Sequence, residues 1–96
     1  MGLKSVGYYQ ATSLATAKDL ATATGAAVPD SADHVTVQAE VQPIRWRDDG
    51  TAPTASVGNL IAVGTTVTFR RGQFANLKLI ETTTSAKANI DYFKTG

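Results

Sequence analysis

The sequence has no cysteine and only one histidine, His34, among its 96 residues. Without cysteine, the fold cannot depend on disulfide bonds, and no thiolate can act as a nucleophile or metal ligand. A serine–histidine–aspartate triad would have to use His34, which falls on the polar side of a predicted strand. His34 also lacks partners at the spacing of a metal-ligand set. These absences argue against an enzyme, and we expect no cofactor and no bound metal.

An excess of charge of one sign and a long apolar run are also missing. Nine Lys and Arg stand against eight Asp and Glu, for a formal net charge of +1. Such a chain lacks the strong field that attracts nucleic acids or anionic membrane surfaces. No apolar run approaches the roughly 18–20 residues of a membrane helix, and residues 1–10 lack the apolar core of a signal peptide. We therefore expect no nucleic-acid partner, no membrane contact and synthesis in the cytoplasm.

The clearest pattern present is an alternation of apolar and polar residues. Val35, Val37, Ala39 and Val41 share one side of an extended chain, which predicts a half-buried strand. The apolar phase then shifts to even positions. Because proline cannot donate to a strand ladder, we expect a bulge or break at Pro43, with the strand resuming through residue 47.

Further short strands are predicted at intervals of about ten residues. They are joined by turn signals and span residues 6–14, 65–70, 74–83 and 86–94. In the first of them, Val6, Tyr8 and Leu14 share one parity, and Tyr9 lies opposite. This succession predicts one all-β domain over residues 1–96, an antiparallel β-sandwich with a jelly-roll-like or Greek-key topology.

The segment Ala15–Pro29 breaks the succession of strands. It is rich in Ala and Thr, which predicts a long N-terminal excursion that is either a loop or a loop with one helical turn. Ser13 could cap that turn, and Gly25 and Pro29 would end any regular structure.

Residues 44–58 gather the only Trp, two of the four Arg and an adjacent pair of Asp. Asp48 and Asp49 resemble a catalytic carboxylate pair, but neighbouring side chains diverge in a turn, which favours bonds to backbone amides or arginine. The segment Arg45–Arg47, together with Arg70 and Arg71, resembles a basic–aromatic nucleic-acid surface. The neighbouring aspartates neutralise it, so we interpret Trp46 as a core or interface anchor.

Four large apolar side chains are predicted opposite the core. They are Tyr9, Phe74, Ile80 and Phe93. Uncovered apolar side chains on the outer face of a sheet are typical of an interface, so these residues are candidates for a subunit or capsid contact. The alternative is that the excursion covers them.

The same dense stretch carries a resemblance to a known group of proteins. Its motif consists of Arg45, Trp46, Arg47, Asp48, Asp49, Gly50, Thr51, Pro53, Thr54 and Gly58. This motif resembles that of small jelly-roll-like virion structural proteins of tailed bacteriophages. The resemblance covers about residues 28–93, including the closing segment Asn89–Phe93, and the Ala/Thr-rich excursion is less similar.

The resemblance implies a capsid cement or decoration protein. Such a protein would bind the major capsid protein on the outer capsid lattice as a homo-oligomer, a dimer or trimer, and stabilise the virion. Two alternatives stay open. One is a head-fibre base or a neck or tail adaptor. The other is a carbohydrate-binding module on the virion, with Trp46 stacking on a sugar.

Overall fold

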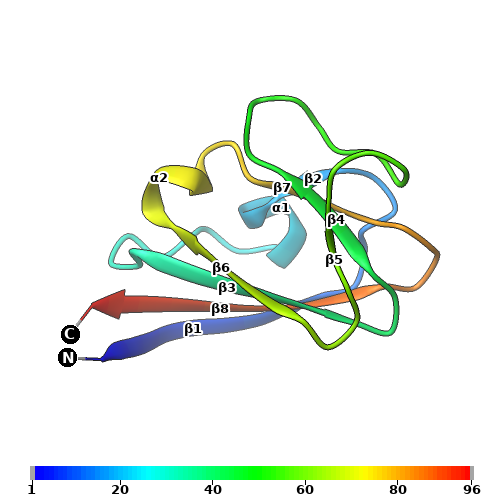
Figure 1. The fold of residues 1–96 in the computed structure, drawn as a ribbon. Helices are drawn as coiled ribbons and strands as arrows, with labels where there is room; N and C mark the ends of the chain where they lie inside the picture. The colour runs from blue at the N-terminus through cyan, green and yellow to red at the C-terminus, as the bar shows by residue number, and fades with distance from the viewer. Residues whose placement is uncertain (1, 96) are drawn as a thin grey trace.

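The structure, a computed structural model, describes residues 2–95. These residues form two four-stranded antiparallel sheets (Figure 1). The long sheet has the strand order β1-β8-β3-β6, and the short sheet has the order β2-β7-β4-β5. The elements in chain order are β1 (Leu3–Ala11), β2 (Lys18–Asp19), α1 (Leu20–Thr24), β3 (His34–Glu40), β4 (Ile44–Arg47), β5 (Asn59–Ile61), β6 (Thr66–Arg70), α2 (Arg71–Phe74), β7 (Lys78–Glu81) and β8 (Lys87–Thr95). The prediction of an all-β, antiparallel sandwich is confirmed.

The inner face of the long sheet follows the predicted alternation. On β3, Val35, Val37 and Ala39 are buried, and they pair across the sheet with buried residues of β8. Because both strands have a side-chain period of two, one register turns every apolar residue of the pair inward. This core is closed from the other sheet by Ile44, Ile61 and Leu79, among others.

β1 departs from the predicted parity. Its pairing with β8 shifts between Ser5 and Gly7, which inserts Val6 as an extra residue. After this bulge Tyr9 faces inward, where its ring contacts that of Tyr92 edge-on, and Tyr8 faces outward with 54% of its surface exposed. The expectation that Tyr9 lies opposite the core is therefore wrong, because a one-residue bulge exchanges the two faces of a strand.

The predicted break near Pro43 is present. β3 ends at Glu40, Val41 adopts a left-handed φ of 73°, and β4 begins at Ile44 and continues through Arg47. Val41 is thus not the last inward residue of β3, as the alternation suggested, but an exposed residue of the turn.

The segment between β1 and β3 contains one strand and one helical turn. α1 is capped by Asp19, whose carboxylate accepts a hydrogen bond from the Thr22 amide at 2.8 Å, and it ends at Gly25 with a φ of 73°. The predicted cap at Ser13 is wrong, because Lys18 and Asp19 pair with β7 before the helix begins. This later start turns Leu20 into the core.

The connection from β6 to β7 is also more helical than predicted. α2 occupies residues 71–74, so the strand expected from Phe74 begins only at Lys78. The helical turn rotates Phe74 inward, where its ring packs edge-on against the Tyr92 ring. The Arg71 guanidinium lies over the Phe74 ring, 5.5 Å from its centroid. Within residues 2–95, neither helix has the length or apolar character to cross a membrane.

Candidate functional site

Residues 2–95 contain no detected pocket and no group of three His, Asp or Glu side chains placed to hold a metal ion. Four surfaces concentrate unusual residues: the motif at 45–58, a cluster around Asp33, one end of the sandwich, and the outer face of the long sheet.

In the motif, Arg45 holds a loop against the short sheet. Its Nε donates to the Ala55 carbonyl at 3.1 Å, and its NH1 donates to the Gly58 carbonyl at 2.9 Å. Gly58 has a φ of 142°, and a Cβ there would lie 3.1 Å from the Cβ of Pro53. The loop 48–58 thus folds back so closely over Arg45 that a side chain at residue 58 would be crowded.

Trp46 lies on the opposite side of β4, between the two sheets. Its ring meets the Phe69 ring of β6 edge-on, with centroids 4.7 Å apart, and its strand neighbour on β7 is the buried Leu79. Such aromatic pairs add roughly 0.5–1.5 kcal/mol to the burial of their area. Trp46 is partly buried and packs against the core, so we interpret it as an anchor that links the two sheets.

The two adjacent aspartates have separate partners. Asp48 accepts from Nε2 of Gln73 at 2.8 Å, whereas Asp49 accepts two bonds from the Arg47 guanidinium. The hydrogen bonds from Arg47 lower the pKa of Asp49, and the same contact raises the pKa of Arg47. The carboxylates do not share a proton, and the pair does not have the geometry of a general acid and base.

The remaining motif residues shape the loop itself. Gly50 has a φ of 88°, and the Thr51 amide donates to the Asp49 carboxylate at 3.3 Å. The hydroxyl of Thr54 accepts from the amides of Ser56 and Val57, which closes a tight turn. Residues 48–58 of the motif thus form a folded loop, which these bonds and those of Arg45 hold in place.

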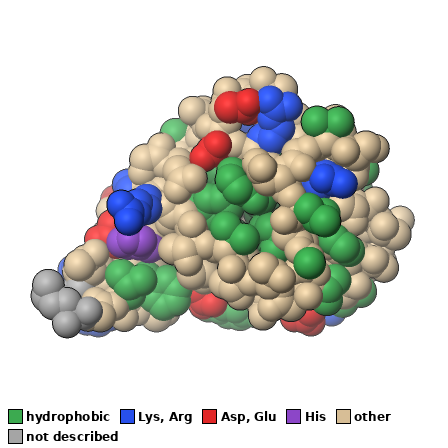
Figure 2. Space-filling view, viewed as in Figure 1, with side chains coloured by type: hydrophobic (Ala, Val, Ile, Leu, Met, Phe, Trp, Pro, Cys, Tyr) green, Lys and Arg blue, Asp and Glu red, His purple; other side chains and the backbone are tan. Residues whose placement is uncertain are grey.

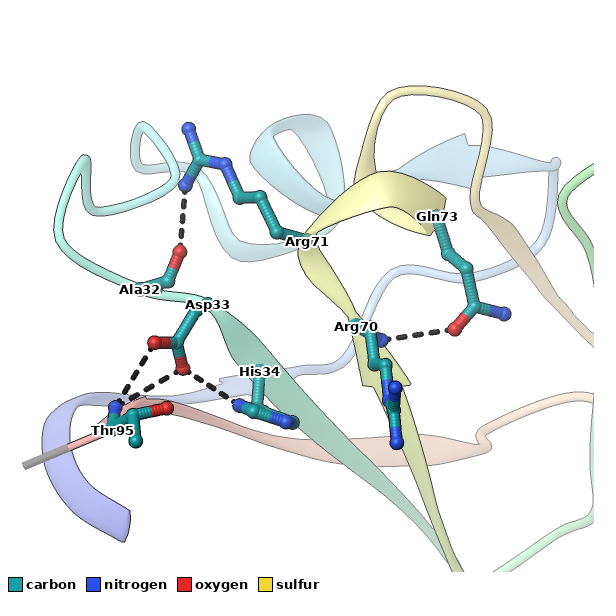
Figure 3. Close-up of polar contacts among 7 residues, drawn as sticks. All are labelled: Ala32, Asp33, His34, Arg70, Arg71, Gln73 and Thr95. Carbon is teal, nitrogen blue, oxygen red and sulfur yellow. Dashed lines mark hydrogen bonds and ion pairs between the residues drawn. The ribbon is translucent and has the colours of Figure 1, made fainter.

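The second cluster joins the start of β3 to the end of β8 (Figure 3). Both carboxylate oxygens of Asp33 accept from the Thr95 amide, and Nδ1 of His34 lies 2.6 Å from Asp33 Oδ1. The bonds from Thr95 and His34 lower the pKa of Asp33 to about 2. Arg71 extends the cluster by donating to the backbone carbonyls of Pro29 and Ala32.

An Asp–His pair of this kind orients the imidazole in serine hydrolases, where a hydroxyl on the second ring nitrogen completes the triad. The register instead places Arg70 directly opposite His34 on the outer face of the long sheet. We therefore interpret the Asp33 cluster as a clasp that fastens the terminal strand.

The four predicted contact residues divide into two pairs. Phe74 and Tyr9 pack into or against the core, so the expectation that they lie on an outer face is wrong for both. Ile80 lies beside Arg45 on the outer face of the short sheet, and Phe93 lies on the outer face of the long sheet. Both are partly exposed. The single helical turn that ends at Phe74 and the bulge before Tyr9 reversed the other two, and neither is visible in the periodicity.

An apolar site at one end of the sandwich was not predicted. This end, opposite the two termini in Figure 1, consists of the turns at residues 41–43, 62–65 and 82–86, and we call it the turn end. Val41 and Val63 are each 51% exposed there, and their turns adjoin through a bond from the Gly64 amide to the Ala39 carbonyl. The phase shift after Val41 was the signal that could have indicated this exposure.

No protein-family model, curated protein or solved structure matches the chain.

Proposed function

We propose that this chain is a bacteriophage virion structural protein, a cement or decoration protein that binds the outer capsid lattice as an oligomer. The motif at 45–58 supports this role through its resemblance to virion proteins of tailed bacteriophages. In this proposal the partners are the major capsid protein and further copies of the chain. The protein would be synthesised in the host cytoplasm and act on the capsid surface.

The strand order supports a jelly roll as the topology. Strand pairs 1–8 and 3–6 lie in one sheet, and pairs 2–7 and 4–5 lie in the other. An eight-stranded jelly roll has this strand order, because a long antiparallel ribbon that pairs strand 1 with 8, 2 with 7, 3 with 6 and 4 with 5 is wrapped into two sheets. Jelly rolls of this kind include viral capsid domains. The Ala/Thr-rich excursion is then the connection that carries β2 and α1.

One observation carries the proposal beyond resemblance: the turn end keeps an apolar residue in an unfavourable conformation. Val41 has a φ of 73°, which a β-branched residue rarely adopts, and it exposes half of its side chain. Strain of this kind costs on the order of 1–3 kcal/mol, and strained residues concentrate at functional sites. Asn or Gly would fit this turn better, and in our proposal a contact of the valine side chain with another protein accounts for its use.

The distribution of charge agrees with a protein partner. On the face in Figure 2, basic side chains lie singly or beside acidic ones and do not form a basic patch. Apolar side chains gather on the same face. Nucleic-acid binding requires clustered positive charge, so this face favours contact with protein.

Co-sedimentation tests the proposal. The purified protein is mixed with expanded and with unexpanded capsids of the phage that encodes it, and the capsids are pelleted. We expect the protein to pellet with at least one form, and light scattering of the free protein to give a dimer or trimer. If it pellets with neither form, the cement role is wrong.

A variant of Val41 separates binding from folding. Val41→Asn suits the left-handed φ and should leave the free energy of unfolding unchanged or higher, while it weakens capsid binding. Val57→Asn is a matched control, because Val57 is equally exposed but belongs to the loop 48–58. If both variants bind the capsid equally well, the turn end is not part of the contact.

The resemblance also supports a second role, a head-fibre base or a neck or tail adaptor. Antibody labelling of intact virions distinguishes the two, because a decoration protein covers the capsid faces and an adaptor occupies one vertex or the tail.

A further inference from the structure

A row of hydrogen-bonding side chains crosses the outer face of the long sheet. Gln10 of β1 lies opposite Asn89 of β8, which lies opposite Gln38 of β3, which lies opposite Thr66 of β6. We call these four residues the polar row. Neighbouring strands are about 4.8 Å apart, so the row places side chains at regular intervals across the whole sheet.

Three amides of the polar row are connected in one direction. Nε2 of Gln10 donates to the side-chain oxygen Oδ1 of Asn89 at 3.2 Å, and Nδ2 of Asn89 donates to Oε1 of Gln38 at 3.1 Å. Nε2 of Gln38 in turn donates to the backbone carbonyl of Gly64 at 3.5 Å. Asn89 also donates to Oε1 of Glu40 at 2.8 Å. Bonds arranged in series polarise one another and hold the side chains in place before any ligand arrives.

Tyr8 lies at one end of this row as an exposed aromatic platform. Its Cα is opposite that of Asp91, yet its hydroxyl donates at 2.5 Å to Oδ1 of Asn89, which precedes Asp91 by two residues in β8. A diagonal neighbour is about 7–8 Å away, so the ring must lean along the sheet to reach it. Tyr8 is 54% exposed, while its hydroxyl end is fixed by this bond.

We infer that Tyr8 and the polar row form a binding surface for a neutral polysaccharide. The C–H face of a pyranose ring would pack on the Tyr8 ring, and sugar hydroxyls would bond to the carboxylate of Glu40 and the amides of Gln10 and Gln38. Hydroxyls both donate and accept, which suits a row that presents carbonyl, amide and carboxylate groups together. This inference does not depend on the cement role.

The charges around the row favour a ligand without negative charge. Glu40 faces Lys87 across the strands, and Asp91 lies beside Tyr8 and opposite Thr36. Together with Arg70, which lies opposite His34 on the same face, these charges give no excess of positive charge that would attract an anionic polymer. The site is separate from Trp46, the residue of the open sugar-stacking alternative, whose ring lies edge-on to Phe69 between the sheets.

Native affinity electrophoresis tests the inference on the intact chain. The probes are gels that contain hydroxyethyl cellulose, dextran or galactomannan, which are neutral, and polygalacturonate, which is anionic. We expect at least one neutral polysaccharide to retard the protein and polygalacturonate not to do so. Failure of all three neutral polymers would overturn the inference.

Three variants locate the site. Tyr8→Ala should weaken binding on the order of tenfold, which corresponds to about 1.4 kcal/mol. Tyr8→Phe keeps the stacking surface and loses only the bond to Asn89, so it should bind with an intermediate affinity. Leu60→Ala is the control, because Leu60 is equally exposed on the other sheet. Equal retardation of Tyr8→Ala and the unmodified protein would contradict the inference, as would self-association through Tyr8 without any retardation.

Discussion

The two sheets of this protein reach stability in different ways. The strands of the long sheet have five to nine residues, and their outer face is open and polar. The strands of the short sheet have two to four residues, and Arg45 holds the loop 48–58 against its outer face. Strands this short form few ladder bonds of their own, so the loop supplies contacts that the ladder lacks.

This difference explains why the motif lies where it does. The concentration of Arg, Asp, Trp, Gly and Pro at 45–58 first suggested a catalytic or nucleic-acid site. Its side chains instead hold the loop in place, and Trp46 links the short sheet to Phe69 of the long sheet. Our two proposals therefore place recognition elsewhere, at the turn end and on the outer face of the long sheet.

The largest effect is expected from Trp46→Ala. Loss of a large aromatic side chain between the sheets should lower the free energy of unfolding by about 3–5 kcal/mol. Urea unfolding followed by circular dichroism measures it, with Leu60→Ala as an exposed control on the same sheet. A folded variant of unchanged stability that has lost only oligomerisation would show that Trp46 acts at a subunit interface instead.

Gly58→Ala tests whether the loop stabilises the short sheet. The added Cβ would meet Pro53, Arg45 and the Trp46 carbonyl within 3.3 Å at a φ of 142°, so we expect a loss of about 1–3 kcal/mol. Hydrogen exchange should quicken in β4 and β5 more than in β3 and β8. Gly72→Ala is the matched control, because a Cβ there meets nothing within 4 Å. If hydrogen exchange quickened equally in both sheets, the loop would not stabilise the short sheet in particular.

Tyr92→Phe probes the core under the long sheet. The Tyr92 hydroxyl is buried without a hydrogen-bond partner among residues 2–95, and its removal should raise the free energy of unfolding by about 1 kcal/mol. Burial raises the pKa of Tyr92 to about 12, so stability should fall as pH rises from 10 through 12. The phenylalanine variant should lose less stability over that range. A destabilised variant would reveal a partner for the hydroxyl.

The smallest effect is expected at the Asp33 cluster. Bonds from Thr95 and His34 lower the pKa of Asp33 to about 2, from the ordinary value of 3.8. Its contribution to stability is therefore present above pH 4 and is lost as pH falls through 2. Asp33→Asn should flatten this acid limb in thermal unfolding, whereas Asp30→Asn should not. Identical acid limbs in all three proteins would show that the clasp adds nothing.

Sequence reasoning succeeded where a strand is long and one of its faces is buried. The alternation at 35–39 predicted both the strand and its inward residues, because a period of two leaves only one register that buries the valines. Pro43 likewise predicted the break. Reasoning failed at Tyr9 and Phe74, because a single bulge or helical turn reverses a face without changing the local pattern.

The sequence by itself determined the all-β class, the inner face of β3, the break before β4 and the turns that separate the strands. Only the tertiary structure decided which strands became neighbours, since pairs such as β1 and β8 lie far apart in the chain. It also changed the interpretation of the motif, because the partners of Arg45 and Trp46 come from a folded-back loop and from the opposite sheet. Local periodicity carries information about burial, whereas these contacts depend on how the sheets pack.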